Sequence, residues 1–271
     1  MTTVAQVLAA APLPRSEARL LLAAALGVPV EALIARPERI VEDGAAARFA
    51  HLAARRAQGA PVAYLLGEKE FHGRRFVVSP AVLVPRPETE LLVELALSRL
   101  RVRRTARVLD LGTGSGCVAI TLALECPAAT VLAVDRSADA LAVARSNAQR
   151  HGARVGFLLG DWYASVSGPF DAIVANPPYV SAADPHLIEL RHEPQSALVA
   201  GPDGLADLRR IVAGAPAHLG AGGWLAVEHG HDQGDSVRRL FAQAGFIDVE
   251  THRDLAGIER VCAGTLAGAR R

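Results

Sequence analysis

The residues of this chain whose types and spacing most directly suggest chemistry are Asn176, Pro177, Pro178 and Tyr179. They follow an apolar run, residues 170–175, that is typical of a buried strand. A residue that precedes proline is disfavoured in helical geometry, so this tetrapeptide is predicted to be rigid and extended. The prolines have no N–H donors, and the carbonyl groups around them can accept. Such acceptors suit a substrate that donates, an amide NH2 or an aromatic amine; a proline-rich turn is the structural alternative.

A glycine-rich loop stands earlier in the chain, directly after a predicted strand at residues 107–111. Its members are Gly112, Thr113, Gly114, Ser115 and Gly116. Glycine lets the backbone approach a ligand closely, and the helix expected over residues 117–124 offers free N–H groups at its N-terminus. The glycines alternate as GxGxG, whereas the dinucleotide fingerprint is GxGxxG. The loop therefore favours a cofactor without a pyrophosphate, with an ordinary loop as the alternative.

Two further strand ends carry residues that complete a nucleoside site. Asp135 ends the next predicted strand, where doubly wound folds place an acid that accepts both ribose hydroxyls. Asp161 and Trp162 follow the third strand, where a carboxylate can accept from an adenine amino group and an indole can cover the ring. A helix cap is the alternative for Asp135, and an ordinary core position is the alternative for Trp162. The three features occur in order at the carboxyl ends of successive strands, where open sheets bind ligands.

The elements that must position these residues read as a doubly wound α/β sheet. Short β-branched runs alternate with alanine-rich helical stretches, which is typical of parallel βαβ units. The predicted strands are residues 107–111, 131–135, 155–159, 172–175 and 224–228. Residues 246–253 and 257–264 read as two more strands with no room for a helix between them. An antiparallel hairpin is therefore expected to close the sheet edge.

The sequence before the glycine loop predicts a separate small domain. Apolar residues recur at helical spacing in residues 1–70, which are assigned to a helical domain. Residues 71–87, with strands at 71–78 and 82–84, read as a short hairpin that links it to a helix starting near Glu88. Residues 88–271 form the larger, ligand-binding domain.

Composition limits the class of protein. Of the 271 residues 51% are hydrophobic, and 29 basic and 28 acidic residues give a formal net charge of +1, so no global field favours nucleic acid or an anionic membrane. Three widely spaced cysteines indicate neither a disulfide framework nor a metal site. The most apolar early stretch, residues 20–26, is far too short to span a bilayer, and no signal-peptide pattern is expected before it. We expect a cytoplasmic protein, without a metal, that does not bind nucleic acid directly.

At superfamily level, the residues from Asn176 to Tyr179 resemble the NPPY motif of seven-stranded, Rossmann-like methyltransferases that use S-adenosylmethionine on amine or amide nitrogen. The segments outside the motif are similar to the release factor glutamine methyltransferases, and with it they extend the match over nearly the whole chain. These segments are residues 61–67, 84–90, 184–187 and 254–257. His72 stands where an aromatic residue is expected.

The resemblance implies transfer of a methyl group from S-adenosyl-L-methionine, leaving S-adenosyl-L-homocysteine, to the N5 side-chain amide of a glutamine. That glutamine lies in the Gly-Gly-Gln motif of class 1 peptide chain release factors, so the reaction modulates translation termination. Gly112 to Gly116, Asp135, Asp161, Trp162 and Asn176 would hold the cofactor. The Asn176 oxygen and the Pro177 carbonyl would accept the two amide hydrogens, with Tyr179 stacked on the amide plane and Pro178 beside it. Residues 1–70 would dock the substrate protein, and the enzyme is expected to be a monomer.

Other enzymes and a binding module are the competing hypotheses. A DNA adenine methyltransferase would use the same acceptors but needs a target-recognition region and a basic surface. A catalytically silent module is disfavoured by the intact motifs, and a nicotinamide-dependent oxidoreductase by the glycine spacing.

Several polar residues have two interpretations. The segment from Arg86 to Glu90 lines a substrate entrance or carries ordinary surface charge, with Thr89 as a helix cap. Glu193 resembles a family position near the active site, with a structural hydrogen bond as the alternative. His229 and His231 form no ligand set with a third residue and are interpreted as structural.

Overall fold

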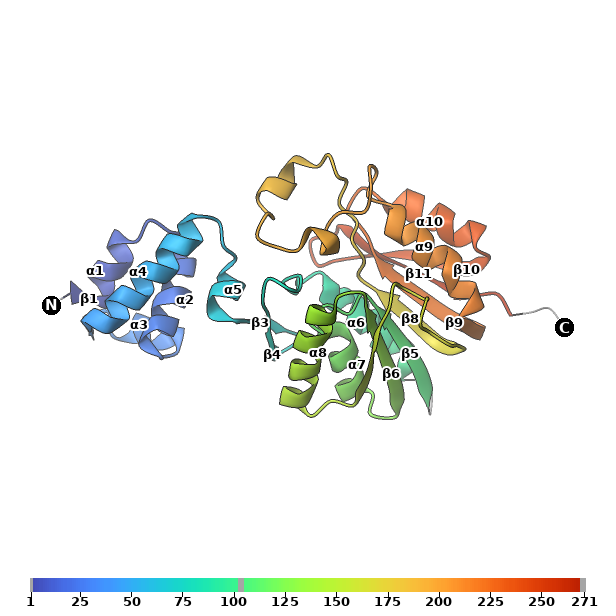
Figure 1. Ribbon diagram of the computed structural model, residues 1–271, viewed down its shortest axis with the longest axis horizontal. Coiled ribbons are helices and arrows are strands. Elements are labelled where there is room, and N and C mark those ends of the chain that lie inside the picture. Colours follow the sequence, from blue (N-terminus) through green and yellow to red (C-terminus); the bar gives the residue numbers. More distant parts are fainter. Residues whose placement is uncertain (1, 102–104, 269–271) are drawn as a thin grey trace. The chain divides into compact units, whose positions relative to one another are not determined.

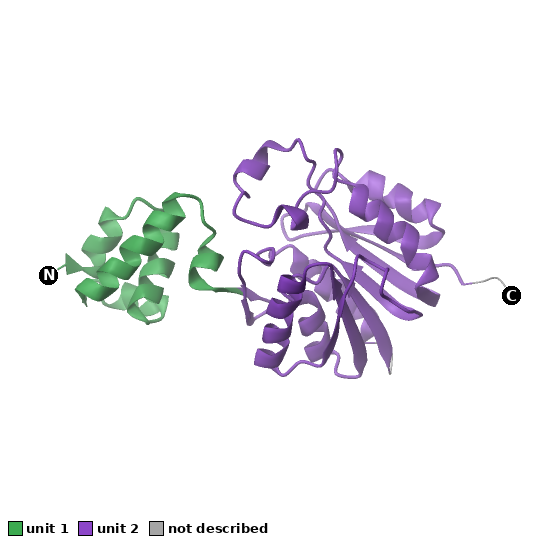
Figure 2. Ribbon diagram, viewed as in Figure 1, with its two compact units in different colours: residues 1–69 green, residues 70–271 purple. Residues whose placement is uncertain are grey.

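The computed structural model describes residues 2–101 and 105–268. It divides into two compact units, residues 1–69 and 70–271 (Figure 2). The assignment of residues 1–70 to docking and of 71–87 to a linker stays a prediction.

The first unit is a small helical domain. Its elements are β1 (Thr2–Thr3), α1 (Val4–Ala10), α2 (Arg15–Leu26), α3 (Val30–Ala35), β2 (Ile40–Val41), α4 (Asp43–Ala57) and α5 (Val62–Leu66). Leu21, Leu22, Leu33 and Phe49 are buried together in its core. The helical spacing of the apolar residues predicted these helices, while the two-residue antiparallel pair of β1 and β2 was not expected.

The second unit contains one seven-stranded sheet in the order β10-β11-β9-β8-β5-β6-β7. Its strands are β5 (Ala106–Leu111), β6 (Ala129–Asp135), β7 (Val155–Leu159), β8 (Phe170–Ala175), β9 (Leu219–Glu228), β10 (Phe246–Arg253) and β11 (Glu259–Leu266). Strands β5 to β9 run parallel to one another, and β11 pairs antiparallel with both β9 and β10. The doubly wound sheet and its antiparallel hairpin are confirmed.

Helices cover both faces of the sheet (Figure 1). They are α6 (Thr89–Leu100), α7 (Cys117–Glu125), α8 (Ala138–His151), α9 (Ala206–Gly214) and α10 (Gly234–Gln243). Side chains alternate along each strand, so Val108 and Val174 pack toward α6, α7 and α8. Leu109 and Ile173 point to the other face and pack with α9 and α10. The loops at the carboxyl ends of the parallel strands therefore lie between two buried layers that fix their positions.

The hairpin before the sheet differs from the prediction. Its strands are β3 (Glu68–Phe71) and β4 (Arg74–Val77), so the expected strand at residues 82–84 was wrong. Three prolines between residues 79 and 88 lack the donors that a ladder needs. The amide of Val84 donates instead to the Glu193 side chain, at 3.0 Å. Residues 79–88 are thereby left as a loop that ends at α6.

Candidate active site

A single pocket gathers most of the residues that the sequence singled out, at the carboxyl ends of β5, β6, β7 and β8. It is lined by residues 81–83, 85, 86, 89, 112–115, 117, 135–137, 140, 160–162, 176, 178, 194, 196 and 197. Of the predicted site residues, Gly116, Pro177 and Tyr179 do not line it. Of the two loop walls, residues 81–86 and 194–197, the sequence singled out Arg86 alone, as a candidate for the substrate entrance.

The glycine loop crosses the pocket floor in a conformation that requires glycine. Gly112, Gly114 and Gly116 have φ values of +72°, +54° and +81°, a region that other residues rarely adopt. The amides of Gly112 and Thr113 both donate to the Val134 carbonyl, at 2.9 and 3.0 Å, which fixes the loop against β6. A Cβ on Gly114 would contact nothing within 4 Å, so open space adjoins its Cα. The loop can therefore lie directly against a ligand.

Gly116 has a different structural role from Gly112 and Gly114. It caps the N-terminus of α7, and a Cβ there would lie 2.8 Å from Ile120 Cδ1 and 3.1 Å from Ala144 Cβ. It therefore permits close packing of α7 and α8 rather than contact with a ligand.

Asp135 is held by two backbone amides. Its Oδ2 accepts from Gly114 N and its Oδ1 from Ser137 N, both at 2.9 Å. The helix-cap alternative does not hold, because Ser137 is the N-cap of α8 and accepts from Ala140 N. A carboxylate oxygen has more than one acceptor site, so both oxygens can still receive the hydroxyls of a ribose.

We expect Asp135→Asn to weaken S-adenosylmethionine binding about 10- to 100-fold. The substitution replaces one carboxylate oxygen, which accepts, with an NH2 group, which would face a group that also donates. Isothermal titration calorimetry measures this dissociation constant. Asp139→Asn is the matched control, since Asp139 is exposed in the first turn of α8 and does not line the pocket. Equal affinities for the two variants would remove Asp135 from the site.

The predicted adenine shelf is anchored by α9. Trp162 has φ +52° and is nearly buried; its Nε1 donates to Asp207 Oδ1 at 3.1 Å, and its ring lies against Gly112. Asp161 Oδ2 pairs with the Arg210 guanidinium at 2.6 Å. Both residues line the pocket, as the sequence indicated, but their partners on α9 lie more than 40 positions away and could not be found from local pattern.

Asp110 is an unpredicted acid beneath the glycine loop. It is almost fully buried, and Thr113 Oγ1 donates to its Oδ2 at 2.6 Å. Burial raises the pKa of Asp110 to about 7, opposed by the Thr113 hydrogen bond. Its place between the apolar residues Leu109 and Leu111 of the strand was the available signal. Because it holds Thr113, it shapes the loop from below.

Asn176 enters the pocket with its amide oriented. Its Nδ2 donates to Thr89 Oγ1 at 2.9 Å, which leaves Oδ1 as an acceptor. Thr89 is buried and lines the pocket; it does not cap α6, whose N-cap is Glu88 without a side-chain cap bond. The Tyr179 hydroxyl donates to Glu228 Oε1 at 3.1 Å, outside the pocket lining. The proposed stacking of Tyr179 on an amide stays a prediction.

An ion pair joins the two loop walls. Arg86, at the pocket rim, pairs with Glu193 at 2.5 Å, and the Glu193 side chain is almost fully buried. Glu193 thereby makes the structural hydrogen bonds that were one of its two interpretations. Arg136 donates to the Ser196 carbonyl at 3.1 Å and holds the second wall.

These residues fit the cofactor that the sequence implied. The loop leaves open space at Gly114, Asp135 offers two oriented oxygens, and Trp162 presents an indole nearby. Among the described residues no group of three or more potential ligands could hold a metal ion. No helix in the described ranges is long and apolar enough to cross a membrane.

Comparisons with known proteins agree with this geometry. Residues 88–192 match the Methyltransferase small domain family, and residues 1–67 match the PrmC N-terminal domain family. The chain is 51% identical to the release factor glutamine methyltransferase of Bordetella pertussis, over 98% of this chain and all of that protein. It is 50% identical to that of Pseudomonas aeruginosa, with the same coverage. A methyltransferase structure from Pyrococcus furiosus shares the fold, with a TM-score of 0.58 at 18% identity over 80% of this chain and 99% of that one.

The sheet order, the glycine loop and the acid at the end of β6 define an S-adenosylmethionine-dependent methyltransferase. Within this class, sequence identities of 51% and 50% over 98% of the chain show the particular family. The chain belongs to the release factor glutamine methyltransferase family.

Proposed function

We propose that this enzyme methylates the N5 side-chain amide of the glutamine in the Gly-Gly-Gln motif of class 1 peptide chain release factors. The observation that carries the proposal is the orientation of Asn176. Because its Nδ2 is engaged by Thr89, its oxygen is left to accept from a substrate NH2 group in the pocket that also holds the glycine loop. An amide nitrogen carries two hydrogens and needs such acceptors.

The chain's own residues can activate a poor nucleophile without a general base. An amide lone pair is delocalised into its carbonyl, and acceptors that hold both hydrogens turn it out of the amide plane. Asn176 Oδ1 and the Pro177 carbonyl are the proposed acceptors, and Tyr179 fixes the amide plane. S-adenosylmethionine supplies an electrophilic methyl group. The proton that the nitrogen loses passes to water or to these acceptors, so the rate depends on preorganised polar groups and alignment.

Other parts of the assignment rest on the same proposal. Residues 1–70 dock the release factor, for which the exposed apolar side chains Leu20, Ile34 and Ile40 of the first unit offer contact area. Such a substrate places the enzyme in the cytoplasm, where it acts as a monomer on protein rather than on nucleic acid.

Incubation of an unmethylated release factor with this protein and S-adenosylmethionine tests the substrate. We expect a gain of one methyl group by intact mass, located by peptide mapping on the Gly-Gly-Gln glutamine. A release factor with asparagine at that position is the matched control and should stay unmodified. If the native factor also stays unmodified while the enzyme binds its cofactor, the substrate assignment is wrong and DNA adenine is the next candidate.

A further inference from the structure

The carboxyl group of Glu228 lies behind the reaction site and acts on two of its residues. Glu228 ends β9 and is 1% exposed. Its Oε1 accepts from the Tyr179 hydroxyl at 3.1 Å, and the Thr89 hydroxyl lies near enough to the carboxyl to lower its pKa. Its Oε2 is buried and has no partner within hydrogen-bond distance in the described part of the chain. No hydrogen bond joins this oxygen to Thr89 in the structure, but Thr89 Oγ1 accepts from Asn176 Nδ2, so the hydrogen of the Thr89 hydroxyl remains available to an acceptor such as this oxygen.

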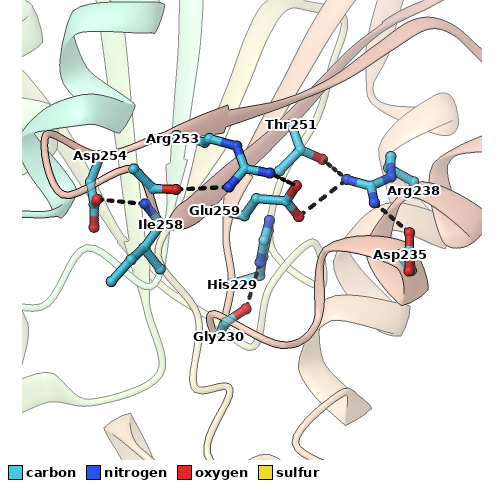
Figure 3. A network of polar contacts seen from close by, with 10 residues as sticks. His229, Gly230, Asp235, Arg238, Thr251, Arg253, Asp254, Ile258 and Glu259 are labelled. Atoms are coloured by element: carbon cyan, nitrogen blue, oxygen red, sulfur yellow. Dashed lines mark hydrogen bonds and ion pairs between the residues drawn. The ribbon is translucent and has the colours of Figure 1, made fainter.

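The backbone around Glu228 is firmly held. Glu228 pairs with Val261 of β11, and the next residue, His229, donates its amide to the Arg260 carbonyl at 2.9 Å. Beyond it, Arg238 on α10 bonds Thr251 and Glu259, and Arg253 pairs with Glu259 at 2.8 Å (Figure 3). This network ties α10 to both strands of the hairpin that adjoins β9.

The direction of the hydrogen bonds that lead from Glu228 to the pocket has a chemical consequence. An ionised carboxylate only accepts, so a Thr89 hydroxyl that donates to it must offer its oxygen to Asn176. Asn176 then donates through Nδ2, as observed at 2.9 Å, and turns Oδ1 toward the substrate. If Thr89 donated to Asn176 instead, the amide would reverse and present NH2 to the substrate's own NH2.

We propose that Glu228 is a positioning residue that sets this direction through Thr89, so that Asn176 presents its oxygen to the substrate amide, and that it holds Tyr179 in place at the same time. The inference rests on the proposed function for its effect on catalysis. It assigns a role in the reaction to a buried acid that touches neither substrate nor cofactor.

The surroundings of Glu228 favour a carboxyl that titrates near neutral pH. Burial raises its pKa to about 7, against the effect of the neighbouring Thr89 and Tyr179 hydroxyls; the Glu88 charge raises the pKa further, and Arg260 lowers it. Besides these groups, the buried Cys117 thiol of α7 is close enough for the Glu228 charge to raise its pKa. The acceptor-only form is therefore gained as pH rises through about 7.

Glu228→Gln is the central variant, since it keeps the shape and removes the acceptor-only character. We expect kcat to fall about 10- to 100-fold, because misaligned reacting groups cost about that much. KM for the release factor and the dissociation constant for S-adenosylmethionine should change less than about twofold, as for an interaction made only in the transition state. The midpoint of thermal unfolding above pH 7 should not fall, because the variant no longer buries a charge.

Two substitutions of Thr89 test whether Glu228 affects kcat through the Thr89 hydroxyl. Thr89→Val should lose activity like Glu228→Gln, Thr89→Ser should keep most of it, and the Val and Gln changes together should cost little more than either alone. Glu250→Gln, at an exposed acid on β10 outside the pocket, is the control and should leave kcat unchanged. Multiplied losses in the double variant, or kcat of Glu228→Gln within twofold of wild type, would overturn the proposal.

Two readouts separate this proposal from the substrate assignment. In wild type, kcat should rise with pH through about 7, and Glu228→Gln should lack this inflection. Without any substrate, the side-chain amide NMR signals of Asn176 should shift over the same pH range in wild type and not in Glu228→Gln. If wild type fails to methylate the release factor, the substrate assignment is wrong. If the Asn176 signals of wild type do not shift with pH, the proposed role of Glu228 is wrong.

Discussion

Replacing Asn176 by alanine is expected to lower kcat about 10²- to 10³-fold, the largest catalytic loss from a single change in this chain. The magnitude is that of removing one preorganised hydrogen-bonding group from a water-excluded site. In this structure Asn176 Oδ1 is the one side-chain acceptor of the motif that is already oriented, since Thr89 engages its Nδ2 at 2.9 Å. Without it, one amide hydrogen of the substrate is unpaired and the lone pair stays delocalised.

Single-turnover methylation of a release factor measures this loss directly. Asn176→Asp is an informative companion, because it keeps an oxygen but cannot donate to Thr89; we expect it to be impaired as well. Thermal unfolding of both variants close to that of wild type would exclude misfolding as the cause. Activity of Asn176→Ala within tenfold of wild type would remove Asn176 from the mechanism.

The parts of the fold that follow from short-range pattern were predictable. Each strand from 107 to 175 combines a β-branched run with a following turn, and β7 has the predicted bounds. Errors fall where tertiary contacts decide. Strand β9 begins at Leu219 rather than near Trp224, where pairing with Phe170 extends it. Residues 82–84 have the composition of a strand, but Glu193, more than 100 positions away, takes their hydrogen bond.

The same division holds for the site. Residues on the loops after β5, β6, β7 and β8 were predictable because parallel strands deliver their carboxyl ends to one edge. The partners that orient them were not. Thr89 looked like a helix cap and Glu228 like the polar end of a strand, and only their common proximity to Asn176 and Tyr179 gives them roles. The roles of Asp207 and Arg210 as partners of Trp162 and Asp161 could likewise not be predicted from the pattern of an amphipathic helix.

Gly204 holds the carboxyl-terminal side of the motif, where it permits a close backbone contact. Gln233 donates through Nε2 to the Tyr179 carbonyl at 3.0 Å and accepts from Gly230 N at 2.8 Å, so it joins the motif to the loop after β9. A Cβ on Gly204 would lie 2.3 Å from the Tyr179 carbonyl oxygen and 2.7 Å from Gln233 Nε2. Since backbone cannot rotate away as a side chain tip can, an added methyl group must displace the motif itself.

Gly204→Ala is therefore expected to lower the free energy of unfolding by about 2–5 kcal/mol, the sum of left-handed backbone strain at φ +70° and of overpacking. Urea unfolding measures the loss. Gly245→Ala is the matched control, because Gly245 has φ +83° but nothing within 4 Å of an added Cβ; it should cost only the strain, about 1–2 kcal/mol. The folded fraction of Gly204→Ala should also lose kcat, because the shift reaches Tyr179 and Asn176. Equal destabilisation by the two alanines would show that the contact with Tyr179 is relieved without moving the motif, and full activity of the folded Gly204 variant would show that the motif tolerates the shift.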